Sequence, residues 1–463
     1  MIKEKGKLKF ILIRKYKLLK FFIILFLLLF YSFRLNLNND IINNNYLTIK
    51  NNINLTIINH INKKIKVAVY AFGIKNGGRA RVTSLLINYF IKIKLFKLYL
   101  FTKIEKEENE YIIPQNIPRI IIKNRIINII KKKKIDILIY QLSFEDEIKL
   151  LNNFKNIKVI FYQHLSIFDW IYGNYTKFKN LYKNYRNSKY VVSIVPFEND
   201  YIFKKWGINS ILMNNFITYD YKNIISSNLS SKTILMIGRA DAKKKRFHIG
   251  INAMEYIVKE IPECKMLIIS ELKGMNKLMI LIDNLNLKNN IIFNGYTSMP
   301  EIYYKNSSLN IFPSISEAFP MVICETEIFG IPNIMIGIDY ITVHEKGIEI
   351  IYDDIPEILA IKSVSLLQNY EYRKILGNEG RKSMKRFNND LLLIKWFKLI
   401  LSIYNGEYFF EIMKKNEKQM TKNNSLFILK NQINLLKKRK SKFKNITISD
   451  FENFNFMEKI KSK

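Results

Sequence analysis

Residues 311–336 read IFPSISEAFPMVICETEIFGIPNIMI, and the prolines and glycine in this run predict strand, loop, helix and strand in succession. Leu309–Phe312 is a short apolar strand. Pro320 stands where a first helical residue is expected, because proline there loses only an N–H that has no partner within the helix. Gly330 ends the helix, and Ile331–Ile336 is a second apolar strand. Two apolar strands joined by a helix predict a βαβ unit, with a parallel sheet buried on both faces.

Two acidic residues mark this unit. Glu317 lies in the loop before the helix, and Glu325 lies about one and a half turns into it. The unpaired N–H groups and positive dipole end of a helix suit an anionic or hydroxyl-rich ligand, and a carboxylate can accept a pair of hydrogen bonds from a ribose diol. One ligand could therefore touch both acids. The alternative is that Glu317 caps the helix and Glu325 is a solvated helical residue.

The pattern Ser-x-x-Glu-x-Phe-Pro, with seven residues between Glu317 and Glu325, resembles the EX7E element of family 4 retaining glycosyltransferases (glycosyl transferases group 1). Members of that family have the α/β GT-B fold, in which two Rossmann-like parallel-sheet domains face a central cleft. The resemblance covers most of residues 65–405, and several motifs occur in the expected order. It implies that Glu325 grips the ribose, that Glu317 and the helix N-terminus orient the donor sugar, and that Phe319 belongs to the donor site.

A glycine loop opens the first domain. The strand Ile65–Tyr70 leads into Gly77 and Gly78 and then into an amphipathic helix through Phe90, which is how a Rossmann-like domain begins. The two glycines let the backbone approach a ligand closely, and they resemble the family's Gly-Gly loop near the donor phosphate and the acceptor. A plain tight turn is the alternative, because the run lacks both GxGxxG and the Lys-Ser/Thr of a P-loop.

His164 follows the predicted strand Val159–Tyr162. A histidine at the carboxyl end of a parallel strand faces the ligand crevice in such folds. Family members often carry a histidine there that contacts the donor sugar or phosphate, so the resemblance makes His164 a candidate donor-binding residue. A structural histidine is an equally good interpretation of the sequence.

Basic residues follow the first strand of the second domain. Arg239 comes directly after Thr233–Gly238, and three lysines, Lys243 to Lys245, follow it. A diphosphate needs cations that stabilise the charge left when the nucleotide departs. Arg239 matches the family's Gly-Arg motif, and of the lysines Lys245 aligns best, with Lys244 next. A solvated charge run is the alternative for all but one of these lysines.

The N-terminus carries a membrane signal. Residues 1–17 are basic, and residues 18–34 form an apolar run that is slightly short for a comfortable membrane span. A cleaved signal peptide is the alternative to an uncleaved anchor, but no Ala-x-Ala-like site follows and the flanking basic side chains can snorkel. The positive-inside rule then places the rest of the chain across the membrane, in the lumen of the Golgi or ER, or beyond the inner membrane in a bacterium.

The remaining boundaries follow from composition and from the resemblance. An Asn-rich stem occupies residues 35–63, and the first, acceptor-binding domain is expected over 64–215. The nucleotide-sugar domain is expected over 216–388. A helix at 389–410 then crosses back to the first domain, and a basic tail, 411–463, has no match to the family.

Composition narrows the possible functions. The 463 residues include 75 basic and 39 acidic ones, a net charge of +36, but lysine is enriched along the entire chain, so charge argues only weakly for nucleic acid. Two cysteines, Cys264 and Cys324, exclude a disulfide framework, and four histidines without HxH or HExxH spacing leave no metal motif. This agrees with transfer that needs neither a metal nor a cofactor.

These observations together predict a membrane-anchored retaining hexosyltransferase that moves a sugar from a nucleotide-diphosphate donor to a glycan or lipid-linked acceptor. The catalytic residues would be Arg239, Lys245 and Glu317. Two alternatives stay open. A catalytically inactive scaffold of the same fold is one, and a basic nucleic-acid-binding protein is the other, although no nucleic-acid motif is present.

Overall fold

The computed structural model describes most of residues 63–406. The predicted basic segment, membrane anchor, most of the stem and the basic tail lie outside the described residues. No helix in the described part of the chain has the length and hydropathy of a membrane span. Within 63–406, the positions that are not described are 76, 124–125, 142–150, 152–156, 163, 165, 167–181, 184, 187, 240–243, 272–274, 298 and 345.

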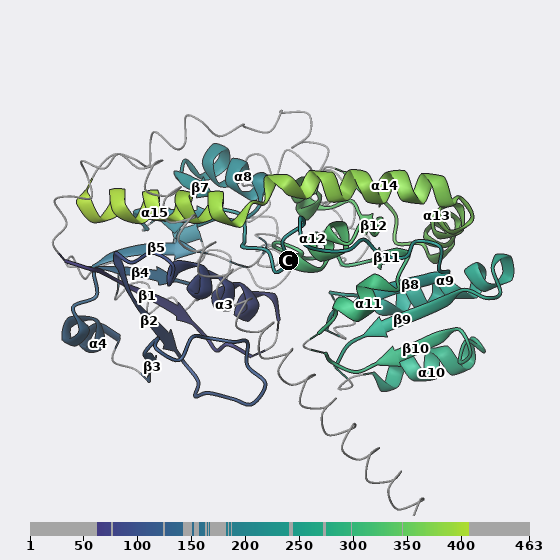
Figure 1. The fold of residues 1–463 in the computed structure, drawn as a ribbon, viewed down its shortest axis with the longest axis horizontal. Helices are drawn as coiled ribbons and strands as arrows, with labels where there is room; N and C mark the ends of the chain where they lie inside the picture. Colours follow the sequence, from purple (N-terminus) through teal and green to yellow (C-terminus); the bar gives the residue numbers. More distant parts are fainter. Residues whose placement is uncertain are drawn as a thin grey trace, which may run out of the picture. The chain divides into compact units, whose positions relative to one another are not determined.

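The first domain is built on a parallel sheet of seven strands in the order β3-β2-β1-β4-β5-β6-β7 (Figure 1). The central strand, β1, reads IKVAVYA and is buried almost throughout, as expected for a strand covered on both faces. The strands are β1 Ile65–Ala71, β2 Phe96–Thr102, β3 Arg119–Ile121, β4 Ile137–Tyr140, β5 Lys158–Tyr162, β6 Tyr190–Ser193 and β7 Ser210–Leu212. The described helices are α3 Gly78–Phe90, α4 Ile126–Lys133 and α8 Pro196–Trp206.

The second domain has a six-stranded parallel sheet in the order β10-β9-β8-β11-β12-β13. Its strands are β8 Thr233–Ile237, β9 Lys265–Ile269, β10 Ile291–Asn294, β11 Leu309–Phe312, β12 Asn333–Ile336 and β13 Ile348–Ile351. Its α-helices are α9 Phe247–Glu260, α10 Asn276–Asn284, α11 Glu301–Lys305, α12 Met321–Ile328, α13 Pro356–Gln368 and α14 Tyr370–Ser383. The 3-10 helices η1 Asp339–Val343 and η2 Met384–Arg386 complete it.

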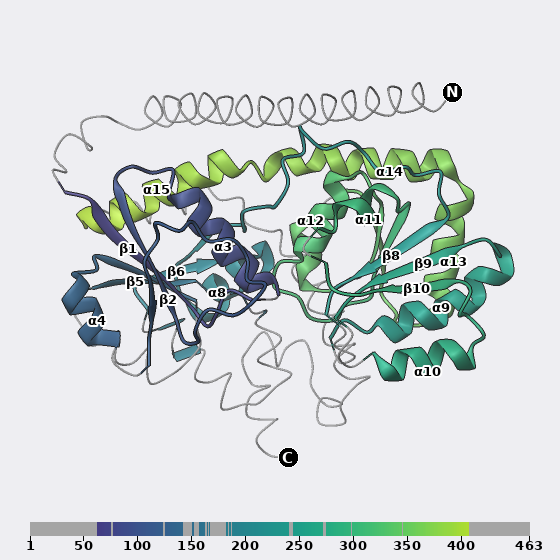
Figure 2. The ribbon, with the colours of Figure 1, turned by 60° about the horizontal axis from the view of Figure 1, so that its bottom comes forward.

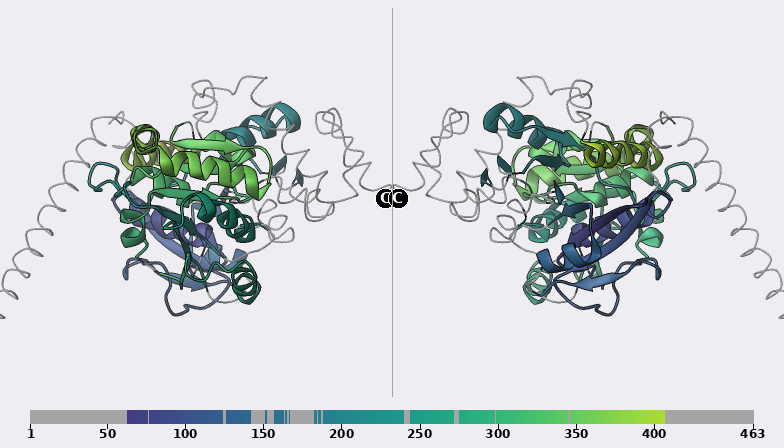
Figure 3. Two further views of the ribbon diagram at one scale, coloured as in Figure 1. Left: turned by 90° about the vertical axis from the view of Figure 1, so that its right-hand side faces the viewer. Right: turned by 90° about the vertical axis from the view of Figure 1, so that its left-hand side faces the viewer.

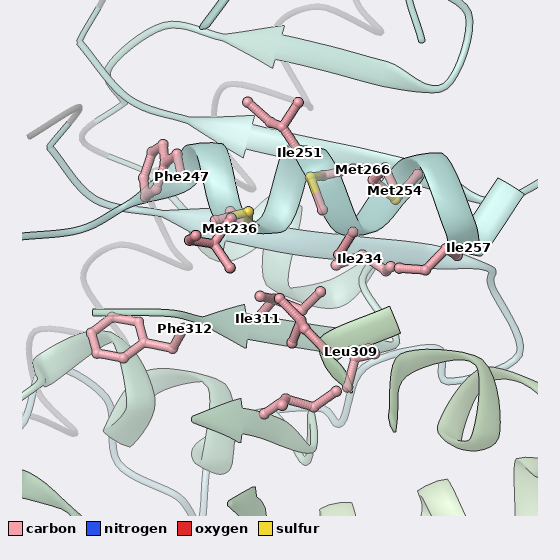
Figure 4. Close-up of a cluster of buried hydrophobic side chains, with 14 of the residues drawn as sticks. Ile234, Met236, Phe247, Ile251, Met254, Ile257, Met266, Leu309, Ile311 and Phe312 are labelled. Carbon is pink, nitrogen blue, oxygen red and sulfur yellow. The ribbon is translucent and has the colours of Figure 1, made fainter. Parts of the chain in front are cut away.

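The core of the second domain lies between α9 and the central strands. Phe247, Ile251 and Met254 recur at helical spacing along α9 and are buried against Met236 of β8 and Met266 of β9 (Figure 4). This packing fixes the carboxyl end of β8 and hence the basic loop that follows it.

The βαβ unit predicted at 309–336 is present, with small shifts at its boundaries. Pro320 precedes α12 instead of forming its first residue, because its carbonyl accepts the first helical bonds, from the amides of Ile323 and Cys324. Gly330 has φ +72° and ends the helix as expected. β12 begins at Asn333 rather than Ile331, since the Ile331 amide still bonds back to the carbonyl of Thr326 at the helix end.

Two pairs of glycines bring α14 against the unit that carries α12. A Cβ atom added to Gly377 would lie 1.9 Å from the carbonyl oxygen of Gly330, directly after α12. A Cβ added to Gly347 would lie 2.4 Å from the Cα of Gly380. Only glycine fits at these contacts, so backbone packs directly on backbone.

The last described helix, α15 Asn389–Asn405, lies on the first domain after α14 has covered the second (Figures 2 and 3). Its buried Trp396 packs edge-on against Phe90, with ring centroids 5.6 Å apart, and against Tyr162, at 5.1 Å. Lys395 Nζ donates to the carbonyl of Leu212, at 2.6 Å. The chain therefore returns from the second domain to the first after α14.

Candidate active site

A cavity of about 530 Å³ lies between the glycine loop of the first domain and the loops after β8 and β11 of the second. Every residue predicted for the site lines it, although these residues come from distant parts of the chain. They are Gly77, Gly78, His164, Arg239, Lys244, Lys245, Glu317, Phe319 and Glu325. The structure thus brings the candidates together, while the role of each stays a prediction.

Glu325 is buried, with 1% of its surface exposed, and its carboxylate accepts from three side chains. Arg81 Nη1 lies 2.7 Å from Oε1, Thr218 Oγ1 donates to the same oxygen at 3.0 Å, and the Tyr304 hydroxyl donates to Oε2 at 2.6 Å. The interpretation of Glu325 as a solvated helical residue is therefore wrong, because α12 lies inside the domain and not on its surface.

Electrostatics keeps this cluster in one protonation state. Burial is the largest single influence on the pKa of Arg81 and lowers it, but the Glu325 carboxylate and the neighbouring tyrosines together outweigh burial, so this pKa is raised above its ordinary value. Burial and the same carboxylate raise the pKa of Tyr304 well above its ordinary value. Arg81 consequently stays charged and Tyr304 stays a hydrogen-bond donor.

Glu317 pairs with Lys245 and also accepts from Ser314 Oγ, at 2.6 Å. It does not cap α12, since Pro320 occupies the N-cap position and no side chain bonds there, so the capping interpretation is wrong. The lysine is oriented by its surroundings as well. Its Nζ lies 5.0 Å from the centroid of the Phe312 ring.

The structure distinguishes the lysines of the basic loop. Lys245 is the one that reaches Glu317. Lys244 also lines the cavity, and its backbone carbonyl accepts from the Ile315 amide, at 3.1 Å. Lys243 lies outside the described residues.

His164 is buried at the floor of the cavity, and its ring packs on Tyr162 with centroids 4.2 Å apart. Burial, and then the charge of Arg79, lower the pKa of His164 to about 3. Its imidazole is therefore neutral at physiological pH and adds no positive charge to the site.

The two glycines of the loop differ in their backbone conformation and in the space around them. Gly77 precedes α3 with φ +85°, a conformation that other residues rarely adopt. A Cβ added to Gly77 would lie 4.0 Å from the guanidinium carbon of Arg239, so the loop lies against that arginine of the second domain. Gly78 has open space around it. Phe319 is buried and packs edge-on against Phe387.

Sequence reasoning missed three polar members of the site. Arg79 and Arg81 lie in the first turn of α3, and Tyr304 is the last but one residue of α11. Their positions directly after the glycine loop could have drawn attention to the two arginines, but nothing in the sequence links Tyr304 to Glu325. Within the described residues, no cluster of His, Cys, Asp or Glu side chains could hold a metal ion.

Comparison with known proteins shows which proteins this chain is similar to. Residues 219–383 match the family described as Glycosyl transferases group 1. The chain carries a glycosyltransferase domain. An uncharacterised glycosyltransferase of Methanocaldococcus jannaschii is 25% identical over 222 residues, which are 41% of this chain and 53% of that protein. The chain thus spans about half the length of this curated relative. The match confirms the expectation of a transferase enzyme.

Solved structures agree on the fold. Sucrose-phosphate synthase from Thermosynechococcus elongatus superposes with a TM-score of 0.64 at 14% identity, covering 74% of this chain and all of that one. HepE from Anabaena, solved in complex with UDP and glucose, gives 0.60 at 13%, covering 73% and 99%. With the two parallel sheets, these neighbours confirm the GT-B fold around the glycosyltransferase domain.

Proposed function

We propose that the protein is a metal-independent retaining glycosyltransferase of family 4, which moves a hexose from a nucleoside-diphosphate donor to a glycan or lipid-linked acceptor. The observation that carries the proposal is the meeting of the predicted residues in one cavity. These residues lie far apart along the chain. Residues that served only in packing or on the solvated surface would not be expected to gather in one cavity. Cations from the loop after β8 and acids from the α12 unit occupy that cavity together.

The proposed step needs only groups of this chain and the two substrates. The acceptor hydroxyl oxygen bonds to the anomeric carbon as the bond from that carbon to the phosphate oxygen breaks, and the hydroxyl proton passes to the departing diphosphate. Arg239 and Lys245 stabilise the charge that develops there. Glu317 holds Lys245 and orients the sugar. Because the departing diphosphate takes the proton, no general base is required from the protein.

We propose a UDP-sugar as the first donor to test, because HepE was solved with UDP and glucose. Thermal shift with UDP, ADP and GDP sugars finds the donor, since a ligand at a hundredfold its dissociation constant stabilises the fold by about 2.7 kcal/mol. Release of free nucleoside diphosphate in the presence of acceptor glycans then measures turnover. Stabilisation without any turnover would favour an inactive scaffold, and no stabilisation by any of these donors would contradict the proposal.

We also propose that residues 18–34 anchor the protein in a membrane as a type II protein. The full-length chain should then sediment with membranes and resist carbonate extraction, while a chain lacking residues 1–34 should be found in the supernatant. Release of the full-length chain by carbonate would contradict the anchor without affecting the proposed activity.

A further inference from the structure

Apart from Lys244, the lysines and arginines that line the cavity fall into two groups. Three of them have carboxylate partners: Lys245 pairs with Glu317, Arg81 with Glu325 at 2.7 Å, and Lys75 with Glu107 at 3.8 Å. Arg79 and Arg239 also line the cavity, and in the described part of the chain neither has a carboxylate partner.

The two arginines without acidic partners meet at the glycine loop. Arg79 belongs to the first turn of α3, and its Nη1 lies 3.4 Å from the carbonyl oxygen of Gln141, just after β4. Arg239 follows β8, and its guanidinium carbon would be 4.0 Å from a Cβ on Gly77, two residues before Arg79. One arginine therefore comes from each domain: Arg79 follows the glycine loop directly in the chain, and the Arg239 guanidinium lies against that loop.

Their proximity has an electrostatic cost. Burial, and then the neighbouring charge of Arg239, lower the pKa of Arg79. Two guanidinium groups that repel one another in a partly enclosed cavity are stabilised when an anion lies between them. A guanidinium carries five N–H donors, and among the described residues Arg79 donates to the Gln141 carbonyl alone, so donors remain for a ligand.

We propose that Arg79 is a further diphosphate-binding residue. It holds the donor diphosphate from the side of the first domain, together with Arg239 of the second. This inference rests on the proposed function. Two planar guanidinium groups match the oxygens of two linked phosphates better than the point charge of a lysine does. Lys245, in contrast, already shares its charge with Glu317.

Arg79 would therefore contribute to both donor binding and departure of the nucleoside diphosphate. As the bond between the anomeric carbon and the phosphate oxygen breaks, negative charge accumulates on the diphosphate, and a cation already in contact with it stabilises that state further. Full binding of the donor would then require both the glycine loop and the loop after β8.

The test compares Arg79→Met and Arg79→Lys with the wild-type chain, using calorimetric titration of UDP, ADP and GDP, sugar transfer and thermal melting. Lys97→Met is the matched control, because Lys97 is an exposed residue of β2 in the same domain and its loss changes the net charge equally. For the nucleotide that binds the wild type, Arg79→Met should weaken binding about 10- to 100-fold and slow transfer at saturating donor, with Arg79→Lys in between.

A merely structural role for Arg79 predicts a different set of results. Removing one of two repelling charges should leave the melting temperature without ligand unchanged or higher, whereas a structural residue would lower it. Unchanged nucleotide affinity in Arg79→Met, or an equal loss in Lys97→Met, would overturn the inference. If the wild type itself binds none of the three nucleotides, the proposed function fails instead.

Discussion

Arg81 Nη1 lies 2.7 Å from Glu325 Oε1, and this ion pair joins α3 of the first domain to α12 of the second. The carboxylate also accepts from Thr218 and Tyr304, so three of its roughly four lone-pair sites are used. A ribose diol bound by Glu325 would have to share this carboxylate with Arg81. The proposed donor binding would thus be linked to contact between the domains at one side chain.

Glu325→Gln should destabilise the fold, because it leaves Arg81 largely buried without a counter-charge. A loss of about 3–5 kcal/mol in the free energy of unfolding is expected for breaking such a pair, and the double variant Arg81→Met with Glu325→Gln should lose less than the sum of the single losses. Urea unfolding of the two single variants and the double variant gives the coupling. Additive losses would show that the pair contributes no interaction energy.

Glu325→Gln should also weaken binding of the free nucleotide and of the whole donor alike, by roughly 1–3 kcal/mol, if the carboxylate grips the ribose. Titration calorimetry well below the melting temperature separates this effect from the loss of stability. Unchanged nucleotide affinity would remove the ribose assignment of Glu325.

Lys245→Ala should slow sugar transfer by a factor on the order of 10² because it removes a cation from the departing diphosphate. Lys259→Ala is the control, since Lys259 is an exposed residue of α9 whose partner is Glu255. Initial rates at saturating donor are the measurement. Should Lys244→Ala lose activity while Lys245→Ala keeps it, the diphosphate contact belongs to Lys244.

His164 should make the protein less stable in acid. Its folded pKa, about 3, lies below the ordinary 6.5, so between these values the unfolded chain binds the proton more readily and stability falls as pH falls. Between pH 6.5 and pH 5 this amounts to about 1.5 kcal/mol. His164→Gln, which cannot titrate, should lose correspondingly less stability over that interval in chemical denaturation. An identical pH dependence in both proteins would refute the neutral assignment.

Gly377→Ala should destabilise the second domain by about 3 kcal/mol or more, because the added methyl group would meet the carbonyl oxygen of Gly330. The gain in helix propensity, about 1 kcal/mol, is too small to offset this clash. Gly295→Ala is the control, since nothing lies within 4 Å of a Cβ at that position, and its stability should change by no more than about 0.5 kcal/mol. Thermal melting of both variants checks the contrast.

Most of the fold could be predicted from local patterns. Apolar runs located β11 at its observed bounds and β12 to within two residues, because a strand covered on both faces must be apolar nearly throughout. Periodicity alone would join α13 and α14 into one helix, but Asn369 separates them, and its side chain accepts from the Tyr372 amide to cap α14. An asparagine inside a helical pattern was the signal that periodicity alone overlooked.

The residues of the site could be predicted from the sequence only where they belong to a recognisable motif. Glu317 and Glu325 were found by their spacing, but the pairing of Glu325 with Arg81 could not be, because an ion pair between residues of different domains leaves no local pattern. Arg81 illustrates this limit. Its place in the first turn of α3 was evident, whereas its partner depends on how two separately folded sheets meet.

The glycine pairs of α14 have a mechanical consequence. Backbone resting on backbone leaves no side chain that could change rotamer and absorb a displacement. α14 leads through η2 into α15 on the first domain. A shift of α14 would therefore displace Gly330 and the end of α12 by the same amount. α14 then transmits a displacement rigidly between the two sheets, and Glu325 lies only five residues before its point of contact, Gly330.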